Sequence, residues 1–340
     1  MQYRWTSLLA LAVLIGAPLL GACSKRTPLA RLTLSAPISD DGSTLCDGLI
    51  DRFIGLPEAH ATADSPDTPL LAGRWWIRSC SAQAVSGELR VRLSGPGWYW
   101  LDEQRKGFAV QQQVPFTLSL AFDGRARGRT TPGLFALWLE PVRAPKVELK
   151  PAAKLDVQGT NAWGALVSAV LPVKGMATER FSHDAASALR DGLQGGVTLT
   201  YEIKKGQSDA TLGKLAQAET PRHPFDDGSA WQVNEHLLLA PGSTHVVGPF
   251  EPGASSLDVS IESGSGLTYQ AVCADHMVDQ YGAIAGGRVG AIAEQSLGAR
   301  GNVAGVGLHE TTLQVERCKY YLVLSALARK RTLAAVRVRS

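Results

Sequence analysis

Cysteine is the residue type whose placement says most about the chemistry of this chain. Cys23 follows an apolar stretch over residues 8–20, with Arg4 ahead of that stretch and the small pair Gly21-Ala22 directly before the cysteine. A basic start, a short apolar core and small residues at its end are the three parts of an export signal. The apolar stretch is too short to indicate a membrane span. We therefore expect these residues to be an export signal.

The run Leu20-Gly21-Ala22-Cys23 resembles the bacterial lipoprotein signal, in which a leucine stands three residues before an obligatory cysteine with small residues between. The resemblance implies a diacylglycerol thioether on Cys23, removal of residues 1–22 and acylation of the new amino terminus. Several acyl chains make a stable membrane anchor, whereas one alone binds marginally. Ser24, rather than aspartate, follows the cysteine, which in enteric members of this family implies the outer membrane. The alternative is an ordinary secretory signal that a cysteine happens to follow.

The four other cysteines are Cys46, Cys80, Cys273 and Cys318. An even number in an exported protein predicts disulfides, and four cysteines allow three pairings. We favour Cys46 with Cys80 and Cys273 with Cys318, because each pair then closes a loop within one expected domain. Loops of this size contribute roughly 3 to 4 kcal/mol each. No CxxC spacing accompanies them, so the cysteines do not indicate a metal, and we predict no cofactor.

One group of polar residues has the types that a nucleophile relay needs. His183-Asp184 lies beside Ser182 and Ser187, and such a relay requires a hydroxyl, an imidazole and a carboxylate within hydrogen-bond reach. Adjacent positions on a helix point in different directions, however, and the chain has no G-x-S-x-G motif. We interpret these residues as the polar surface of a helix and predict no catalytic residue here.

The densest set of metal-capable side chains lies later in the chain. It matches neither a helical zinc pair nor an EF-hand loop in its spacing, so we interpret it as a solvated linker and predict no metal. The alternative is an envelope hydrolase or metal-dependent enzyme whose site lies at this linker, near His223, Asp226 and His236. The full set is His223, Asp226, Asp227, Glu235 and His236.

Aromatic residues gather in two neighbouring expected strands, at Trp75-Trp76 and at Trp98-Tyr99-Trp100. Successive strand residues face opposite sides, so Trp75 lies outside if Trp76 faces the core, and Trp98 shares a face with Trp100. Exposed tryptophans can stack on sugars, rest at a lipid headgroup layer or cover an apolar ligand. Trp75, Trp98 and Trp100 are therefore our candidate ligand-facing aromatics, with core packing as the alternative.

The elements that would position these residues are mostly strands. After a tether over residues 23–43, the three-and-four spacing of apolar residues predicts a helix over 44–56 that Pro57 ends. From Trp75 the period changes to two, with turn residues such as Gly95-Pro96-Gly97 between segments. The predicted strands are 74–85, 88–94, 98–102, 107–122, 133–140 and 146–157.

Helical patterns return in the middle of the chain. We predict one helix that Asn161 caps and Pro172 halts, and a second over residues 178–193 with Phe181, Ala185, Ala188 and Leu189 facing inward. A strand over 197–203 follows. Residues 204–230 have the composition of a polar connection, and we place a domain boundary within it near Pro221.

The last part of the chain has seven short apolar-rich segments, which is the number and spacing of a β-sandwich. Residues 281–307 differ in their Gly/Ala/Val content, and we expect a surface excursion there with a short helix over 289–295. The segments are 236–240, 244–250, 256–263, 267–274, 311–315, 320–326 and 332–338. The predicted fold is therefore mainly β (α+β), with an antiparallel sheet and packed helices over residues 44–220 and a β-sandwich over 221–340.

Composition narrows the function further. Lysine and arginine number 34 against 31 aspartates and glutamates, a formal net charge of +3, so no strong field attracts nucleic acid. We predict a cell-envelope lipoprotein that is not an enzyme and has a binding or scaffold role. Its expected partners are the membrane, through the anchor, and a lipid, a glycan or another envelope protein. A long sheet around amphipathic helices is compatible with a tubular lipid-binding fold, a likeness of architecture alone.

Overall fold

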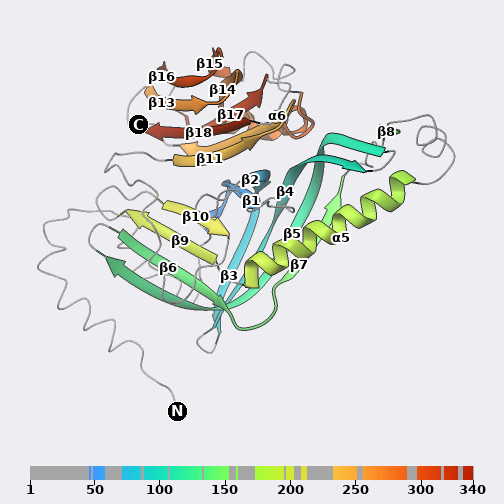
Figure 1. Cartoon of the computed structure of the whole chain (residues 1–340). Coiled ribbons are helices and arrows are strands. Elements are labelled where there is room, and N and C mark those ends of the chain that lie inside the picture. Colours follow the sequence, from blue (N-terminus) through green and yellow to red (C-terminus); the bar gives the residue numbers. More distant parts are fainter. Residues whose placement is uncertain are drawn as a thin grey trace, which may run out of the picture.

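The computed structural model describes residues 46, 49–57, 71–85, 88–105, 108–131, 134–152, 158–159, 173–194, 197–202, 208–212, 233–250, 256–288, 297–314, 318–327 and 332–339. These residues form eighteen β-strands and the helices α5 and α6. The strands lie mostly antiparallel, in one sheet of fourteen and one of four (Figure 1). This part of the chain is mainly β, as its alternating sequence predicts. Neither helix has the length and apolar character of a membrane span.

The amino-terminal strands surround one long hairpin. Its strands, β4 (Glu88–Arg105) and β5 (Phe108–Thr131), pair antiparallel from Leu89 opposite Gly124 to Arg105 opposite Phe108. The other strands of this part are β1 (Phe53–Pro57), β2 (Leu71–Trp76), β3 (Ser79–Val85), β6 (Leu134–Pro141), β7 (Lys146–Pro151), β8 (Gln158–Gly159), β9 (Val197–Glu202) and β10 (Ser208–Leu212).

The expected turn at Gly95-Pro96-Gly97 is wrong, because β4 continues through it. A side chain at Gly95 would overlap the carbonyl oxygen of Trp76, so glycine is what allows the two strands to approach. Before this segment β4 pairs with β3, and after it β4 pairs with β2. The glycines therefore mark the place where β4 changes its neighbour, and the expected strand over 74–85 is accordingly two strands.

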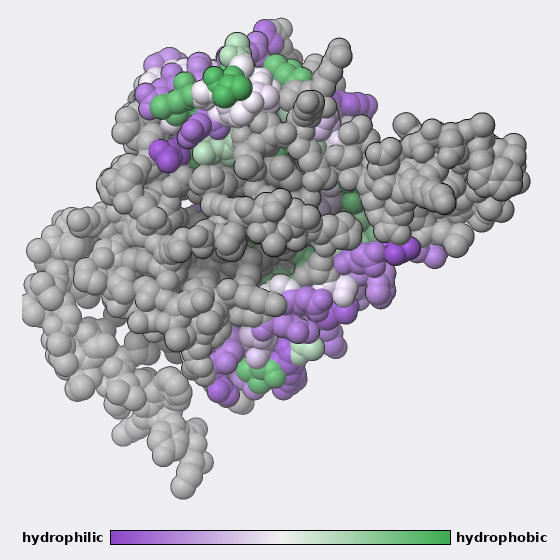
Figure 2. Space-filling model, in the orientation of Figure 1, coloured by the Kyte–Doolittle hydropathy of each residue, from purple (hydrophilic) through white to green (hydrophobic). Residues whose placement is uncertain are grey.

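Helix α5 (Val173–Gln194) covers the inner face of this sheet, where it contacts β7 and β6 (Figure 1). Its residues Phe181, Ala185, Leu189 and Leu193 are buried and join the apolar side chains of the sheet in one core. Figure 2 shows that its outward surface is hydrophilic. The helix predicted over residues 178–193 is thus confirmed, with an earlier start. The helix expected after Asn161 lies outside the described residues.

The carboxy-terminal strands form two sets that pack on a shared apolar cluster. Residues of this cluster include Leu237, Tyr269, Leu322 and Val336. One set continues the large sheet, joined to it by a parallel pair at Leu71 and Leu237. It consists of β11 (Val233–Leu239), β18 (Thr332–Arg339), β13 (Ser256–Ser263) and β16 (Gly307–Gln314). The four-stranded sheet consists of β12 (Thr244–Phe250), β17 (Tyr320–Ala326), β14 (Leu267–Cys273) and β15 (Leu297–Val303).

The helix expected over residues 44–56 is wrong in its second half. A helical turn at Cys46 and Leu49 ends at Asp51, whose φ of 64° is left-handed. Phe53–Pro57 then form β1, which pairs with β2. The physical reason is that both faces of β1 are covered: Ile54 joins the amino-terminal core and Phe53 joins a second cluster. An apolar run that is buried on both faces fits either period.

Two expected loops also contain regular structure. Helix α6 (Ala274–Ala285) and β15 occupy much of the region from Tyr281 to Gly307 that we expected to be a surface excursion, and Met277 and Ile284 of α6 are buried. The short helix expected over 289–295 lies outside the described residues. Strand β10 lies within the expected polar connection over 204–230 and pairs with β9.

Candidate functional site

The candidate site is the place where the amino-terminal strands meet the four-stranded sheet and α6. Five aromatic rings pack there, and we call them the junction cluster: Phe53, Trp76, Trp98, Tyr281 and Tyr321. They come from β1, β2, β4, α6 and β17, so the cluster joins both halves of the chain.

The rings contact one another in well-defined geometries. Phe53 stacks on Trp76 with ring centroids 5.3 Å apart and meets the edge of Tyr321 at 5.3 Å and 84°. Tyr281 stacks on Trp76 at 5.6 Å and lies tilted against Trp98 at 5.8 Å. Offset-stacked and edge-to-face pairs of this kind each add about 0.5 to 1.5 kcal/mol beyond the burial of their area.

Each polar atom of these rings has a backbone partner. The Trp98 Nε1 donates to the carbonyl oxygen of Thr244 at 2.8 Å, and the Tyr281 hydroxyl donates to the carbonyl oxygen of Gly97 at 3.1 Å. Because these partners lie 146 and 184 positions apart in the chain, each bond ties one half of the protein to the other. Burying an indole N–H or a phenol hydroxyl without such a partner costs free energy, so these bonds offset the cost of burying the rings.

Gln113 of β5 adds a double link across the same boundary. Its side-chain oxygen accepts a hydrogen bond from the Thr244 amide at 2.9 Å, and its Nε2 donates to the Ile284 carbonyl oxygen at 2.7 Å. One amide side chain therefore satisfies a donor on β12 and an acceptor on α6. Gln113 is only 9% exposed, so removal of its amide would leave the Thr244 N–H buried without this acceptor. The Ile284 carbonyl oxygen would keep the hydrogen bond from the Gly287 amide.

Asp51 lies at the edge of the cluster and binds two of its rings. Its carbonyl oxygen accepts hydrogen bonds from Trp76 Nε1 at 3.0 Å and from the Tyr321 hydroxyl at 2.5 Å. Its carboxylate pairs with Arg78, whose guanidinium lies 4.3 Å from the centroid of the Trp76 ring. Both charged side chains are more than 40% exposed, so the ion pair itself contributes at most about 1 kcal/mol.

Burial raises the pKa of both tyrosines of the junction cluster. It raises the pKa of Tyr281 above its ordinary value, and it raises the pKa of Tyr321 to about 12, with the nearby Asp51 carboxylate acting in the same direction and the Trp76 hydrogen bond and Arg78 opposing it. Both phenols are therefore neutral hydrogen-bond donors at physiological pH. The arrangement is suited to holding two parts of a protein together.

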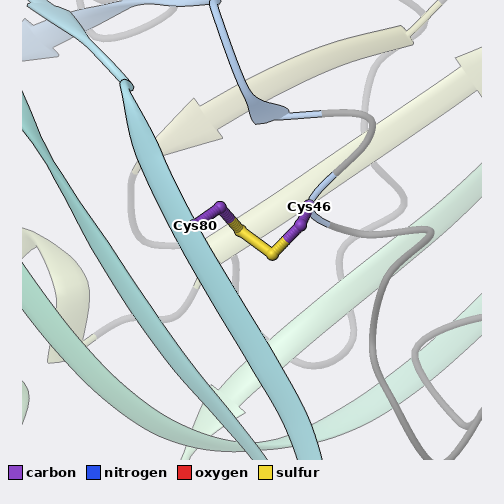
Figure 3. Close-up of a disulfide and its surroundings, with 2 residues drawn as sticks. All are labelled: Cys46 and Cys80. Atoms are coloured by element: carbon purple, nitrogen blue, oxygen red, sulfur yellow. A yellow bond between two sulfur atoms is a disulfide. The ribbon is translucent and has the colours of Figure 1, made fainter.

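Two of the sequence-predicted features are covalent links, and the structure forms both. Cys46 pairs with Cys80 and Cys273 pairs with Cys318, with Cα atoms 5.3 and 6.0 Å apart. Figure 3 shows the first of them between the turn before β1 and strand β3. Cys23 lies outside the described residues.

The three tryptophans that we expected to face a ligand lie in different environments. Trp75 is 1% exposed and lies in the amino-terminal core, while Trp98 is 1% exposed in the junction cluster and Trp100 is half-buried. The expectation that Trp75 lies outside when Trp76 faces a core is wrong. Strand β2 has a core on each face, so alternation places both tryptophans inside.

The polar residues of α5 do not form a relay. His183 Nδ1 lies 3.4 Å from the Asp184 carboxylate at the exposed helix surface, but the Ser182 hydroxyl donates to the Thr178 carbonyl oxygen one turn earlier. This confirms the interpretation as a polar helix surface.

The linker set is only partly described. His223, Asp226 and Asp227 lie outside the described residues, and Glu235 and His236 belong to β11. Within the described ranges, the structure holds no group of three His, Cys, Asp or Glu residues that could bind a metal ion.

Gln113, Tyr281 and Tyr321 are the junction residues that sequence reasoning missed. The incomplete alternation of Gln111-Gln112-Gln113 within an otherwise apolar strand was the available signal for Gln113. A glutamine in a half-buried strand has to find polar partners, but the sequence does not say which.

No protein-family model matches the chain, and no curated protein matches it. Among solved structures, a glycoside hydrolase family 43 arabinoxylan arabinofuranohydrolase from Bacillus subtilis is similar at 12% identity with a TM-score of 0.22, covering 82% of this chain and 70% of that one. A structure of extended synaptotagmin 2, comprising its SMP domain and two C2 domains, aligns at 7% identity and a TM-score of 0.17, covering 78% and 53%. An exo-beta-1,3-galactanase from Phanerochaete chrysosporium aligns at 7% identity and a TM-score of 0.18, covering 84% and 96%. Likenesses this distant carry no argument about fold or function.

Proposed function

We propose that this protein is a lipid-anchored scaffold of the bacterial cell envelope, held at the outer membrane by acyl chains on Cys23, and that it acts by binding an envelope protein rather than by catalysis. The anchor rests on the resemblance of Leu20-Gly21-Ala22-Cys23 to a lipoprotein signal. The scaffold role rests on the junction cluster and its hydrogen bonds.

The contacts of the junction cluster hold the two halves of the protein in a fixed relation. A scaffold must keep distant surfaces in a fixed relation, and here a double hydrogen bond from Gln113 and the packed rings join β5 and β4 to β12 and α6. Moving the two halves apart would expose these rings to water, which costs roughly 25 cal/mol for each Å² of apolar surface, and would exchange the hydrogen bonds between the halves for hydrogen bonds to water. One partner can therefore contact both halves without first ordering them.

The finer architecture belongs to the same proposal. After a tether over residues 23–43, residues 44–220 form a domain of antiparallel sheet and helices, and residues 221–340 form a β-sandwich. The apolar cluster shared by the two carboxy-terminal sets of strands supports the sandwich, because packed sheets bury one face of each.

Photo-crosslinking in cells tests the scaffold role. A photoreactive residue would replace His183 on α5, whose side chain is 84% exposed, or Val278 on α6, which is 56% exposed. We expect adducts with a discrete envelope protein from these surfaces, and we expect Cys23→Ser to abolish them by releasing the protein from the membrane. Turnover of lipid or glycan esters by the purified protein, with no adduct from either position, would contradict the proposal.

Lipid carriage is the second candidate, favoured by the way α5 packs against β7, which pairs with β5 of the long β4–β5 hairpin (Figure 1). Long strands around an amphipathic helix are compatible with a tubular lipid-binding fold. Native mass spectrometry of the purified protein separates the two candidates: a non-covalent lipid, lost without change to the covalent mass at Cys23, supports carriage, and its absence supports the scaffold.

A further inference from the structure

Strand β16 lies at one end of the large sheet (Figure 1). Among the strands that the structure describes, only β13 pairs with it, from Ser256 opposite Gln314 to Ser263 opposite Gly307. In an antiparallel ladder every second residue directs its N–H and C=O away from the neighbouring strand. The outer edge of β16 therefore presents main-chain donors and acceptors at the spacing of another extended chain.

The inner face of β16 holds the strand in place. Leu313 is 5% exposed and belongs to the apolar cluster of the carboxy-terminal strands. The ring of His309 lies 5.9 Å from the ring of Tyr269 on β14, and its Nε2 atom lies 3.4 Å from the Tyr269 hydroxyl oxygen. A partner would thus meet a strand that is already ordered, which reduces the entropy lost on binding.

The outward face of β16 combines apolar and acidic side chains. Leu308 is 62% exposed, and Val306, just before the strand, is 83% exposed. Glu310 lies two positions after Leu308 and so on the same face, and Glu262 of β13 lies directly opposite Leu308. Both glutamates are exposed. Leu308 therefore has a carboxylate beside it along the strand and another across the ladder. Figure 2 shows apolar residues beside hydrophilic ones on this part of the molecule.

The two carboxylates favour a basic partner. Opposite charges on neighbouring strands stabilise a sheet, whereas like charges that face each other destabilise it. Arg337 of β18 shares this face but lies two strands inward, beyond Ser260. A lysine of an added strand could lay its apolar stem along Leu308 while its ammonium group reaches Glu310.

The same charges disfavour a second copy of the chain. For two antiparallel copies of β16 with their faces aligned, the registers of longest overlap are centred on Glu310 or on Thr311. These registers place the two Glu310 carboxylates opposite or diagonal to each other. Like charges at such positions destabilise the pairing.

We propose that the outer edge of β16 binds an extended segment of a protein partner by strand addition, and that this segment carries basic side chains beside Glu310. The inference rests on the proposed function, since it names the surface with which the scaffold binds its envelope partner. Main-chain hydrogen bonds supply the attachment, and the side-chain pairs supply the selection.

Hydrogen exchange of the full-length protein with two synthetic peptides tests the proposal. One peptide alternates valine with lysine, and the matched control peptide alternates valine with glutamate. We expect the lysine peptide to slow amide exchange in β16 and not in β7. The glutamate peptide should bind about tenfold more weakly, because its carboxylates face Glu310. The anisotropy of dye-labelled peptides measures the two affinities.

Charge reversal identifies the edge as the binding surface. Glu310→Lys should exchange the preference, so that the glutamate peptide binds more tightly than the lysine peptide. Glu148→Lys on β7, whose side chain is 69% exposed, is the matched control and should leave the preference unchanged. Both variants should fold, because each replaces an exposed side chain.

Failure of this inference and failure of the scaffold role give different results. Cross-links to an envelope protein from His183 or Val278 that survive in Glu310→Lys, with unprotected β16 amides, would keep the scaffold and overturn the edge as its binding surface. Protected β16 amides in a protein that yields no cross-links in cells would support the edge and contradict the scaffold. Equal affinity for both peptides would overturn the selection of a basic segment, and a peptide-free dimer with protected β16 amides would replace that segment by a second copy.

Discussion

Gln113 and Thr244 are hydrogen-bonded across the boundary between the two halves of the protein, although they lie 131 positions apart in the chain. The same glutamine reaches the carbonyl oxygen of Ile284 at the end of α6. This side chain and the packed rings beside it hold the amino-terminal strands against the four-stranded sheet and α6. The strength of that link is measurable.

Gln113→Leu should lower the free energy of unfolding by about 1 to 3 kcal/mol, because it leaves the Thr244 amide buried without a partner. The Ile284 carbonyl oxygen loses one of its two hydrogen bonds and keeps the one from the Gly287 amide. Urea unfolding followed by tryptophan fluorescence measures the change. The matched control is Gln314→Leu at the exposed end of β16, which should stay within about 0.5 kcal/mol of the wild type. Equal effects of the two substitutions would show that the bridge contributes nothing.

Gly95→Ala should destabilise the protein by about 3 kcal/mol, because the added methyl group meets the Trp76 carbonyl oxygen at the point where β4 passes from β3 to β2. Gly192→Ala in α5 should instead stabilise it by up to about 1 kcal/mol, because alanine is the better helix former and no atom lies within 4 Å of the added group. Thermal unfolding of both variants provides the comparison. Opposite signs are the prediction, and a neutral Gly95→Ala would disprove the close approach.

The disulfides are expected to contribute about 4 kcal/mol each, from the loops of 34 and 45 residues that they close in the unfolded chain. Double replacement of Cys46 and Cys80 by alanine should remove one such contribution and leave the other, as measured by urea unfolding with and without reductant. Peptide mapping without reduction should find Cys46 linked to Cys80 and Cys273 linked to Cys318. A peptide that joins Cys80 to Cys273 would contradict both links.

Stability should fall at alkaline pH through the buried phenols. Burial raises the pKa of folded Tyr321 to about 12, against roughly 10 in the unfolded chain. A raised pKa means that the stabilising contribution is complete below pH of about 10 and is lost as the pH rises toward the folded value. Urea unfolding at several alkaline pH values should show this decline. Tyr321→Phe, which keeps the ring and removes the ionisable group, should make it shallower. An unchanged slope would show that the pKa of Tyr321 is the same in the folded and unfolded chain.

Sequence reasoning predicted the elements whose evidence is local. The three-and-four spacing of Phe181, Ala185 and Leu189 indicated the core face of α5, and an even cysteine count in an exported chain indicated the two disulfides. These features depend on a periodicity or on a rule of pairing, and both are visible in a short stretch of sequence.

The candidate site depends on contacts that no local pattern contains. Phe53 belongs to an apolar run that suits a helix or a strand, and only its position between β2 and Tyr321 decides the outcome. Trp75 and Trp76 are both buried because cores lie on both sides of β2, whereas alternation alone predicts one exposed residue. Gln113 shows the same limit, because its partners lie on strands and helices far along the chain.

Mass spectrometry of the mature amino terminus, on protein extracted from bacterial membranes, tests the central claim most directly. A lipid-anchored scaffold requires cleavage between Ala22 and Cys23, with a diacylglycerol thioether and an amide-linked acyl chain on Cys23. Unmodified Cys23, or an amino terminus at another residue, would contradict the account.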